Sequence, residues 1–196
     1  EADRSGLTLE PVGKKLGNNL TATARLNLNE VEVPIENLLG NEGAGLTCLE
    51  QYFDESRIMA AARAVGNASG SLDRALEYVK GREQFGKKIA EFQVSQHKIA
   101  DMATKIELAR LITYKAAWHF DQGKPDSSLS AMAKLTAART AMEVGAQTIQ
   151  LFGGYGFMTE YDVERYYRDA KVIELQDGIK DVQKDIIARS VIGKIR

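Results

Sequence analysis

The segment ELQDGIKD of this 196-residue chain contains two residues that could take part in chemistry, Asp177 and Gly178. A carboxylate held against a weakly acidic carbon could remove a proton from it as a general base. The same dipeptide is a common turn signal, and an aspartate just before VQKDIIARSVIGKI could cap a helix by accepting hydrogen bonds from its first N–H groups. Local sequence favours the turn and helix-cap interpretation, so any catalytic one depends on the rest of the chain.

Two other glycine-containing segments, GREQFGKK and LFGGYGF, interrupt helical patterns. Each alone is typical of a helix end. Together with LQDGIKD they favour backbone brought close to a flat or phosphorylated ligand, with Arg82 to pair with an anion and Phe85 to cover an aromatic ring. GGYG lacks the GxGxxG spacing and follows a helical segment, so a dinucleotide-binding fold is not indicated. The pattern predicts a cofactor or nucleotide site at one end of a helical bundle.

Composition limits the other possibilities. Hydrophobic residues make up 44% and charged residues 27%, which is typical of a globular domain. The formal net charge of −1 gives no general attraction for nucleic acid or anionic lipid. Cys48 cannot form an intrachain disulfide and is expected to be a small buried residue; His97 and His119 lack neighbouring ligands, so no transition-metal site is expected. No apolar run is long enough to cross a membrane.

Residues 1–40 have a strand pattern. Leu7 and Leu9, and later Leu26 and Leu28, alternate with polar residues, which predicts half-buried strands. A shift of phase at Asn29 indicates a turn or bulge, followed by a possible third strand that ends at Pro34. Because so few strands cannot form a stable sheet alone, this region is predicted to be the incomplete end of a β-domain.

Residues 41–196 have a helical pattern. Long helices are predicted over 45–82, around 99–120 and over 129–152, and shorter ones over 163–175 and 180–195. Pro125 bars continuation between the second and third, and Ser127 or Ser128 could cap the third. The third helix is apolar around much of its girth, so it should be central. The predicted fold class is mainly α: an up-and-down bundle of the four-helix type, preceded by a short β remnant.

Five segments, in order and with their spacing, resemble the acyl-CoA dehydrogenases: KKLGNNLTATARLNLNEVEVPIENLLGNEGAGL, FDESRIMAAARAVG, GREQFGKKIAEFQ, QLFGGYGFMTEYDVERYYRDAK and DGIKDVQKDIIARSVIG. The resemblance runs from about residue 7 to the end. It implies a flavoprotein with an N-terminal helical domain, a middle β-domain and a C-terminal bundle, of which this chain covers the last strands and the bundle. A cytoplasmic location, or the mitochondrial matrix in a eukaryote, would follow.

The resemblance also implies roles for individual residues. The implied partners are FAD, an acyl-CoA, a second copy of the chain in a dimer or tetramer, and an electron-transferring flavoprotein. Four segments match FAD contacts of the family: Arg82, Glu83, Gln84 and Phe85; Phe92 and Gln93; Gln150, Leu151, Phe152, Gly153 and Gly154; and Ile179, Lys180 and Asp181. In the family the segment that matches residues 82–85 usually contacts the FAD across a subunit interface. Residues matching the acyl-CoA site are Asp54, Glu55, Ser56, Arg57 and Gly178.

Arg82 and Arg57 also have simpler interpretations. Arg82 could be a cation favoured by the dipole at a helix C-terminus. Arg57 could form an ion pair with Asp54 on its own helix.

In the family, a glutamate followed by Gly-Thr removes the α-proton of the acyl thioester while hydride leaves the β-carbon for the flavin. The base's own N–H and a flavin hydroxyl stabilise the enolate oxygen. Here Asp177 replaces the glutamate and Ile179 the threonine. The missing methylene withdraws the carboxylate by roughly 1.5 Å, and a misplacement of about 1 Å can cost about 10²-fold in rate.

Some family members carry the base on the long helix instead, at a position that is Ser56 here, which cannot serve. The adjacent Glu55 points about 100° away on a helix. Asp177 is therefore the candidate base.

Three alternatives remain at this stage. The protein could be an acyl-CoA dehydrogenase with a shorter base. It could be a flavin oxidase that resembles nitroalkane oxidase, a relative with this fold that uses an aspartate base. It could also be a non-catalytic bundle. The 196-residue chain alone is expected to form a stable bundle that binds flavin weakly or not at all.

Overall fold

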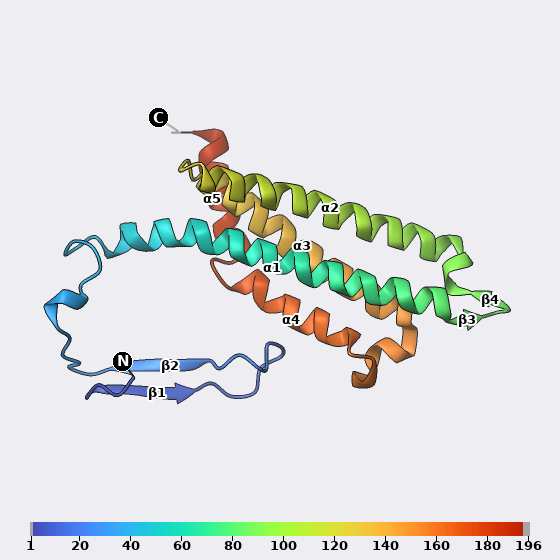
Figure 1. Cartoon of the computed structure of the whole chain (residues 1–196), viewed down its shortest axis with the longest axis horizontal. Helices are drawn as coiled ribbons and strands as arrows, with labels where there is room; N and C mark the ends of the chain where they lie inside the picture. Colours follow the sequence, from blue (N-terminus) through green and yellow to red (C-terminus); the bar gives the residue numbers. More distant parts are fainter. Residues whose placement is uncertain (1, 194–196) are drawn as a thin grey trace.

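The computed structural model describes residues 2–193, in which five helices pack into a bundle and a β-hairpin lies beside it (Figure 1). The helices are α1 (Gly45–Gly81), α2 (Gln93–Asp121), α3 (Ser127–Phe152), α4 (Val163–Leu175) and α5 (Lys180–Ile192). The predicted mainly α class is confirmed. Among the described residues, no helix has the length and apolar character needed to cross a membrane.

Helix α3 is the centre of the bundle, as the sequence predicts. It packs against each of the other four helices, and more than half of its 26 residues are buried. Small side chains make this possible because they let helix axes approach closely. At Gly145, a Cβ atom would lie 3.1 Å from the Tyr167 Cα of α4, so glycine permits that contact. The fully enclosed alanines of α1 and α3 include Ala61, Ala64, Ala68, Ala133, Ala137 and Ala141.

The start of α3 differs from the prediction. Its N-cap is Asp126, whose carboxylate accepts a hydrogen bond of 3.0 Å from the Leu129 N–H. The serines predicted as caps do not have this role. The Ser127 hydroxyl instead donates to Asp54 Oδ2 of α1, at 2.6 Å. A serine that could cap its own helix thus connects two helices.

The N-terminal strands pair as a hairpin, β1 (Leu7–Pro11) antiparallel to β2 (Ala24–Leu28), with Leu9 opposite Leu26. The prediction of half-buried strands is wrong for most positions, because no further sheet in the described residues covers Leu9, Leu26 and Leu28. The possible third strand ending at Pro34 is not formed among the described residues, for the same lack of a partner strand.

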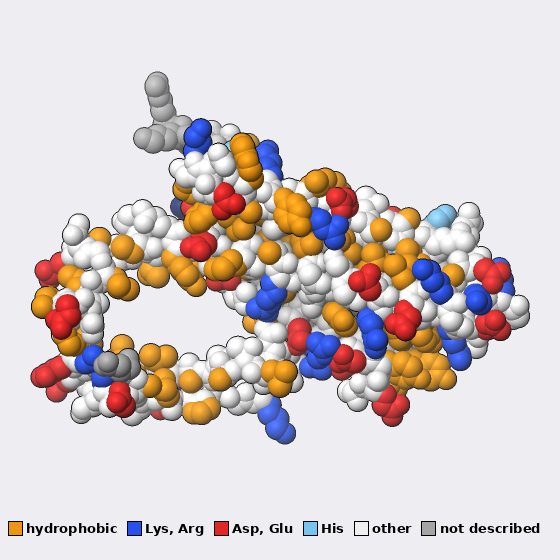
Figure 2. Space-filling model, in the orientation of Figure 1, with side chains coloured by type: hydrophobic (Ala, Val, Ile, Leu, Met, Phe, Trp, Pro, Cys, Tyr) orange, Lys and Arg blue, Asp and Glu red, His pale blue; other side chains and the backbone are white. Residues whose placement is uncertain are grey.

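Cys48, expected to be buried, is exposed near the start of α1. Figure 2 shows that the hairpin, the N-terminal part of α1 and the bundle enclose an opening with hydrophobic side chains along its rim. Exposed apolar residues on these segments include Leu26, Leu28, Leu38, Leu46 and Leu49. Part of the apolar surface of these segments is therefore not covered by any residue that the structure describes.

The loop between β1 and β2 is attached to α4. Arg168 Nη1 donates to the Leu16 carbonyl at 2.8 Å, and the Asn18 N–H donates to Asp169 Oδ1 at 2.6 Å. Between these bonds Gly17 lies directly against the helix, where a Cβ atom would be 2.4 Å from the Arg168 carbonyl oxygen. Glycine is required here by close approach.

We expect Gly17→Ala to displace this loop from α4, because the added methyl group would overlap backbone atoms that cannot move aside. Limited proteolysis should then cut the 12–23 segment faster than in the parent protein. Gly13→Ala is the matched control, since no atom lies within 4 Å of a Cβ there. Equal cleavage of both variants would show that the loop is not held by this contact.

Candidate functional site

The loop between α4 and α5 has an unusual backbone conformation. Asp177 has φ 54° and Gly178 has φ 94°, both in the region that favours glycine. Aspartate tolerates this region better than most side chains. At Gly178 a Cβ atom would lie 2.6 Å from Gln183 Nε2, so glycine is required there for space as well. Both residue types of the Asp-Gly pair are thus explained by the loop.

The helix-cap interpretation of Asp177 is wrong. The N-cap of α5 is Ile179, two residues later, and it has no side-chain cap. The Asp177 carboxylate is partly exposed and accepts no hydrogen bond from any residue that the structure describes, and the Asp177 N–H likewise donates to none of them. The acidic group and its amide are therefore available to a ligand.

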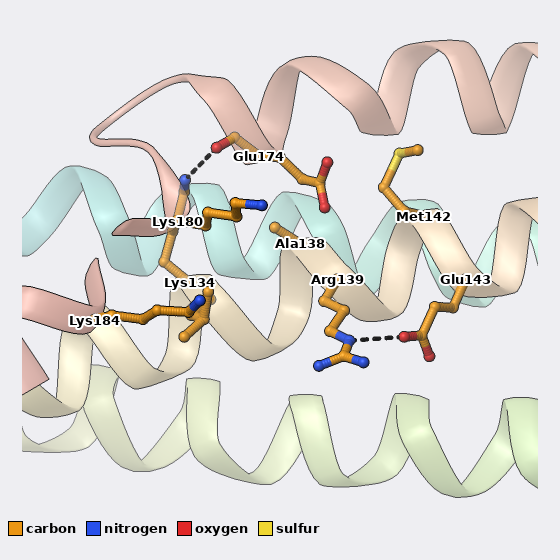
Figure 3. A pocket seen from close by; sticks show the side chains of 9 residues that line it. Lys134, Ala138, Arg139, Met142, Glu143, Glu174, Lys180 and Lys184 are labelled. Atoms are coloured by element: carbon orange, nitrogen blue, oxygen red, sulfur yellow. Dashed lines mark hydrogen bonds and ion pairs between the residues drawn. The ribbon is translucent and has the colours of Figure 1, made fainter. Parts of the chain in front are cut away.

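Two buried polar side chains hold the other side of the loop. Lys134 Nζ, from α3, donates to the Gly178 carbonyl at 2.6 Å and to the Glu174 carbonyl at 3.2 Å. Gln183 Nε2, from α5, donates to the carbonyls of Asp177 (3.0 Å) and Gly178 (2.9 Å). Lys134 is 1% exposed and Gln183 is 0% exposed. Figure 3 shows Lys134 reaching from its helix to the end of α4.

These two residues were not among the predicted site residues. The available signal is a lysine within AMAKLTAA, a stretch of α3 that is otherwise small and apolar. A charged residue in such a stretch is rarely buried unless it is paired. For Gln183 the local sequence gives no comparable signal.

The surroundings of Lys134 connect the loop to the long helix. Burial lowers the pKa of the Lys134 ammonium below its usual value, and the Arg57 guanidinium lowers this pKa further. The carboxylates of Asp177 and Glu174 raise the same pKa and partly offset the lowering. Asp177 and Arg57, predicted separately as base and substrate contact, thus both act on one buried cation. A further bond, from Arg63 Nη1 to Gln176 Oε1 at 3.4 Å, joins α1 to the residue before Asp177.

In the DESR segment of α1, Asp54, Ser56 and Arg57 are buried and Glu55 is exposed. The predicted ion pair is confirmed: Arg57 Nη1 lies 3.0 Å from Asp54 Oδ1. The Arg57 Nε, also buried, has no hydrogen-bond partner among the described residues. Ser56 donates to the Phe53 carbonyl at 3.4 Å. The one buried carboxylate of this segment, that of Asp54, is thus already paired.

A cavity of about 430 Å³ lies between α3, α4 and α5, behind the loop (Figure 3). Lys180, predicted as a cofactor contact, lines it together with Lys184 and Glu174. No group of three or more His, Cys, Asp or Glu in the described part of the chain could hold a metal ion.

At the far end of α1, the GREQFGKK segment forms a small hairpin, β3 (Glu83–Gln84) with β4 (Lys87–Lys88). Phe85 (φ 54°) and Gly86 (φ 78°) make its two-residue turn, the conformation typical of tight hairpins. The Phe85 ring is 93% exposed and meets the Phe92 ring edge-on at 6.5 Å. The hairpin thus presents an aromatic ring outward.

The glycine-rich end of α3 lies beside this hairpin. The Phe152 ring stacks on Tyr78 of α1 at 3.9 Å, and Arg82 Cζ lies 5.1 Å from the centre of the Tyr155 ring. A cavity of about 390 Å³ is lined by the C-terminal turns of α1 and by Phe152. Burial raises the pKa of the Tyr78 phenol, and the nearby Arg82 partly offsets this.

The backbone next to this cavity is open. A Cβ atom at Gly153 or Gly154 would meet no atom within 4 Å. An open glycine backbone beside Arg82 and exposed Phe85 suits a ligand that combines phosphate with a flat ring.

The predicted cofactor residues therefore fall into two groups. Residues 82–85, 92–93 and 150–154 lie at one end of the bundle, and residues 179–181 lie with Asp177 towards the other (Figure 1). Lys134 and Gln150 both belong to α3 and are separated by about 24 Å along its axis. The structure brings the first three segments together, and places the fourth next to Asp177.

Comparison with known proteins identifies the family of the chain. Residues 43–192 match the family model of the acyl-CoA dehydrogenase C-terminal domain. The chain is 42% identical over 192 residues to cyclohexane-1-carbonyl-CoA dehydrogenase of Geobacter metallireducens, covering 98% of the chain and 50% of that protein.

Two solved structures are also similar. One is butyryl-CoA dehydrogenase of Megasphaera elsdenii, with a TM-score of 0.96 and 40% identity over 98% of the chain and 50% of that protein. The other is a chain in the structure described as the electron transferring flavoprotein of Acidaminococcus fermentans, with a TM-score of 0.97 and 42% identity over 99% of this chain and 51% of that one. The chain spans about half the length of the relatives it matches. By sequence and by fold it belongs to the acyl-CoA dehydrogenase family, whose C-terminal helical domain it contains.

Proposed function

We propose that the protein containing this chain is an FAD-dependent acyl-CoA dehydrogenase that uses Asp177 as its base. The observation that carries the proposal is the α4–α5 loop. At the position of the family's base it holds a carboxylate that accepts no hydrogen bond from any described residue, and the carbonyls of Asp177 and Gly178 are bound by other side chains. The reaction is the formation of a double bond between the α- and β-carbons of an acyl-CoA thioester.

In this proposal the Asp177 carboxylate takes the α-proton of the thioester. An α-proton of this kind is weakly acidic, so the developing negative charge on the thioester oxygen needs a donor. The Asp177 N–H, which donates to no other described residue, is positioned to supply one.

FAD, when bound, supplies the acceptor for the hydride that leaves the β-carbon. The chain's contribution to holding it would come from Arg82 towards the diphosphate, from Phe85 at the hairpin tip, and from the open backbone of Gly153 and Gly154. Residues Glu83, Gln84, Phe92, Gln93, Gln150, Leu151 and Phe152 belong to the same end.

The separation of the two groups supports a homo-oligomeric enzyme. If residues 82–85 contact the cofactor of one subunit, residues 179–181 of the same chain are placed to contact that of another. Each chain would then serve two flavin sites, which suits a dimer or tetramer. The similarity to a chain from a structure of an electron transferring flavoprotein supports such a flavoprotein as the electron acceptor.

The acyl-CoA would lie against the DESR face of α1. Asp54 is held by Arg57 and Ser127, which leaves the buried Arg57 Nε as the donor without a partner among the described residues. Ser56 and Gly178 complete the surface that faces the thioester. Exposed Glu55 would lie outside it.

A flavin oxidase is the second candidate. It is favoured by Asp177 in place of glutamate and by Ile179 in place of threonine, since both departures fit a smaller and more acidic carbon acid. Oxygen consumption with a carbon acid, without reduction of the flavin by any acyl-CoA, would support it. If the protein neither consumes oxygen with a carbon acid nor is reduced by an acyl-CoA, it is a non-catalytic homologue.

The proposal predicts that an acyl-CoA bleaches the visible flavin band of the whole protein under anaerobic conditions. A panel of acyl-CoAs of different chain lengths and branching should contain at least one that does so. Asp177→Asn should bind the same acyl-CoA and fail to bleach, because the amide cannot take the proton. Bleaching of the Asn variant at the parent rate would remove Asp177 from the mechanism.

Asp177→Glu should lower the rate of flavin reduction about 10- to 100-fold, measured by stopped-flow absorbance. The loop holds this residue at φ 54°, where aspartate is favoured over longer side chains, and the proposed pocket is built around the shorter carboxylate. A faster Glu variant would show instead that the site geometry suits a glutamate, and that aspartate at position 177 lowers the rate of the reaction.

A further inference from the structure

We propose that Lys134 and Gln183 are positioning residues for the reaction: they fix the peptide planes that follow Asp177, and Lys134 also binds the Glu174 carbonyl before it, so that the Asp177 carboxylate and N–H keep their direction towards the substrate. This inference rests on the proposed function of Asp177. Neither side chain touches the reacting atoms in this account. Both act through the backbone of the loop between α4 and α5.

The hydrogen bonds define which parts of the loop are fixed. The Asp177 carbonyl belongs to the peptide plane between residues 177 and 178, and Gln183 Nε2 binds it at 3.0 Å. The Gly178 carbonyl belongs to the next plane and receives two bonds, from Lys134 at 2.6 Å and from Gln183 at 2.9 Å. Two consecutive planes are thus held by side chains from two different helices.

Such holding is needed because the loop is not otherwise stable in this conformation. A non-glycine residue in the left-handed region has an unfavourable backbone conformation, which persists only when its surroundings impose it. Gly178, at φ 94°, could adopt many other conformations at little cost. Without the two donors, the peptide planes after Asp177 could rotate, and the loop between α4 and α5 could take another path that displaces the carboxylate.

The burial of Lys134 is costly, which argues that it has a specific purpose. It is 1% exposed, and burial is the main cause that lowers the pKa of its ammonium. A methionine of similar length would fill the same space without the cost of removing a charge from water. Lys134 Nζ donates to the carbonyls of Glu174 and Gly178, which lie before and after Asp177 in the chain. The buried charge therefore serves to hold this loop.

The test is Lys134→Met in the whole protein loaded with FAD, assayed with the acyl-CoA that reduces the parent. We expect kcat to fall at least about tenfold, towards 100-fold, because a displacement of about 1 Å at the base is sufficient for that loss. KM should change by less than about threefold, and the isotope effect for deuterium at the α-carbon should increase. The melting temperature should change little, because the gain from removing a buried charge is offset by the loss of the two hydrogen bonds to the Glu174 and Gly178 carbonyls.

Hydrogen exchange provides a second readout that needs no turnover. The amides of residues 176–179 should exchange faster in Lys134→Met than in the parent. Lys98→Met is the matched control: Lys98 Nζ, on α2, donates to Gln147 Oε1 of α3 at 2.6 Å and is remote from the loop in sequence. The control variant should keep the kcat of the parent and the exchange rates of residues 176–179.

Gln183→Leu tests the same loop from α5 and should give the same combination of lowered kcat and unchanged KM. The proposal is overturned if both variants keep the parent kcat, or if in both the loss of kcat only follows a loss of folded protein. A parent enzyme that no acyl-CoA reduces would instead overturn the proposed function. A parent that is reduced, with Lys134→Met and Gln183→Leu both reduced equally fast, would overturn this inference alone.

Discussion

The structure depends on the close packing of four helices around α3. Alanine, glycine and serine at the contacts let the helices approach closely, and the buried hydrogen bond from Ser71 to Thr148, at 2.8 Å, fixes α1 against α3. Because α3 touches every other helix, side chains along it reach loops that are distant in sequence. Lys134 near its beginning reaches the α4–α5 loop, while Phe152 at its end stacks against α1.

This central helix gives the chain two distinct ends. One presents a hairpin tip, an arginine and open glycine backbone; the other presents a carboxylate on a constrained loop. The distance between them, about 24 Å along α3, is fixed by the rise of the helix and not by flexible segments. In the proposed enzyme this rigid spacing would set how subunits are arranged around their cofactors.

Much of the fold follows from sequence periodicity, because helices as long as α1 and α3 carry many consistent positions. The details that fail depend on partners distant in sequence. Ser127 or Ser128 was expected to cap α3, but the Ser127 hydroxyl donates to Asp54 of α1 and the cap is Asp126. Cys48 was expected to be buried, yet nothing in the described residues covers it. Apolar character alone does not indicate which surface finds a partner within the chain.

In the candidate site, too, some residues can be predicted from the sequence and others depend on partners distant in the chain. The family resemblance points to Asp177, and in the folded chain both Asp177 and Arg57 of the DESR segment act on the pKa of Lys134. Lys134 and Gln183 themselves could not be assigned from sequence, since their roles come from carbonyl groups whose positions only the folded loop defines. A buried lysine among alanines indicates that some partner exists, but not which one.

The most direct test is exchange of α-protons with solvent, followed by NMR in deuterated buffer. The ligand is an acyl-CoA analogue with sulfur at the β-position, which has α-protons but no β-hydride to lose. The account predicts that the whole protein with FAD exchanges these protons and that Asp177→Asn, binding the analogue equally well, does not. Equal exchange by the two proteins would contradict the assignment of Asp177 as the base.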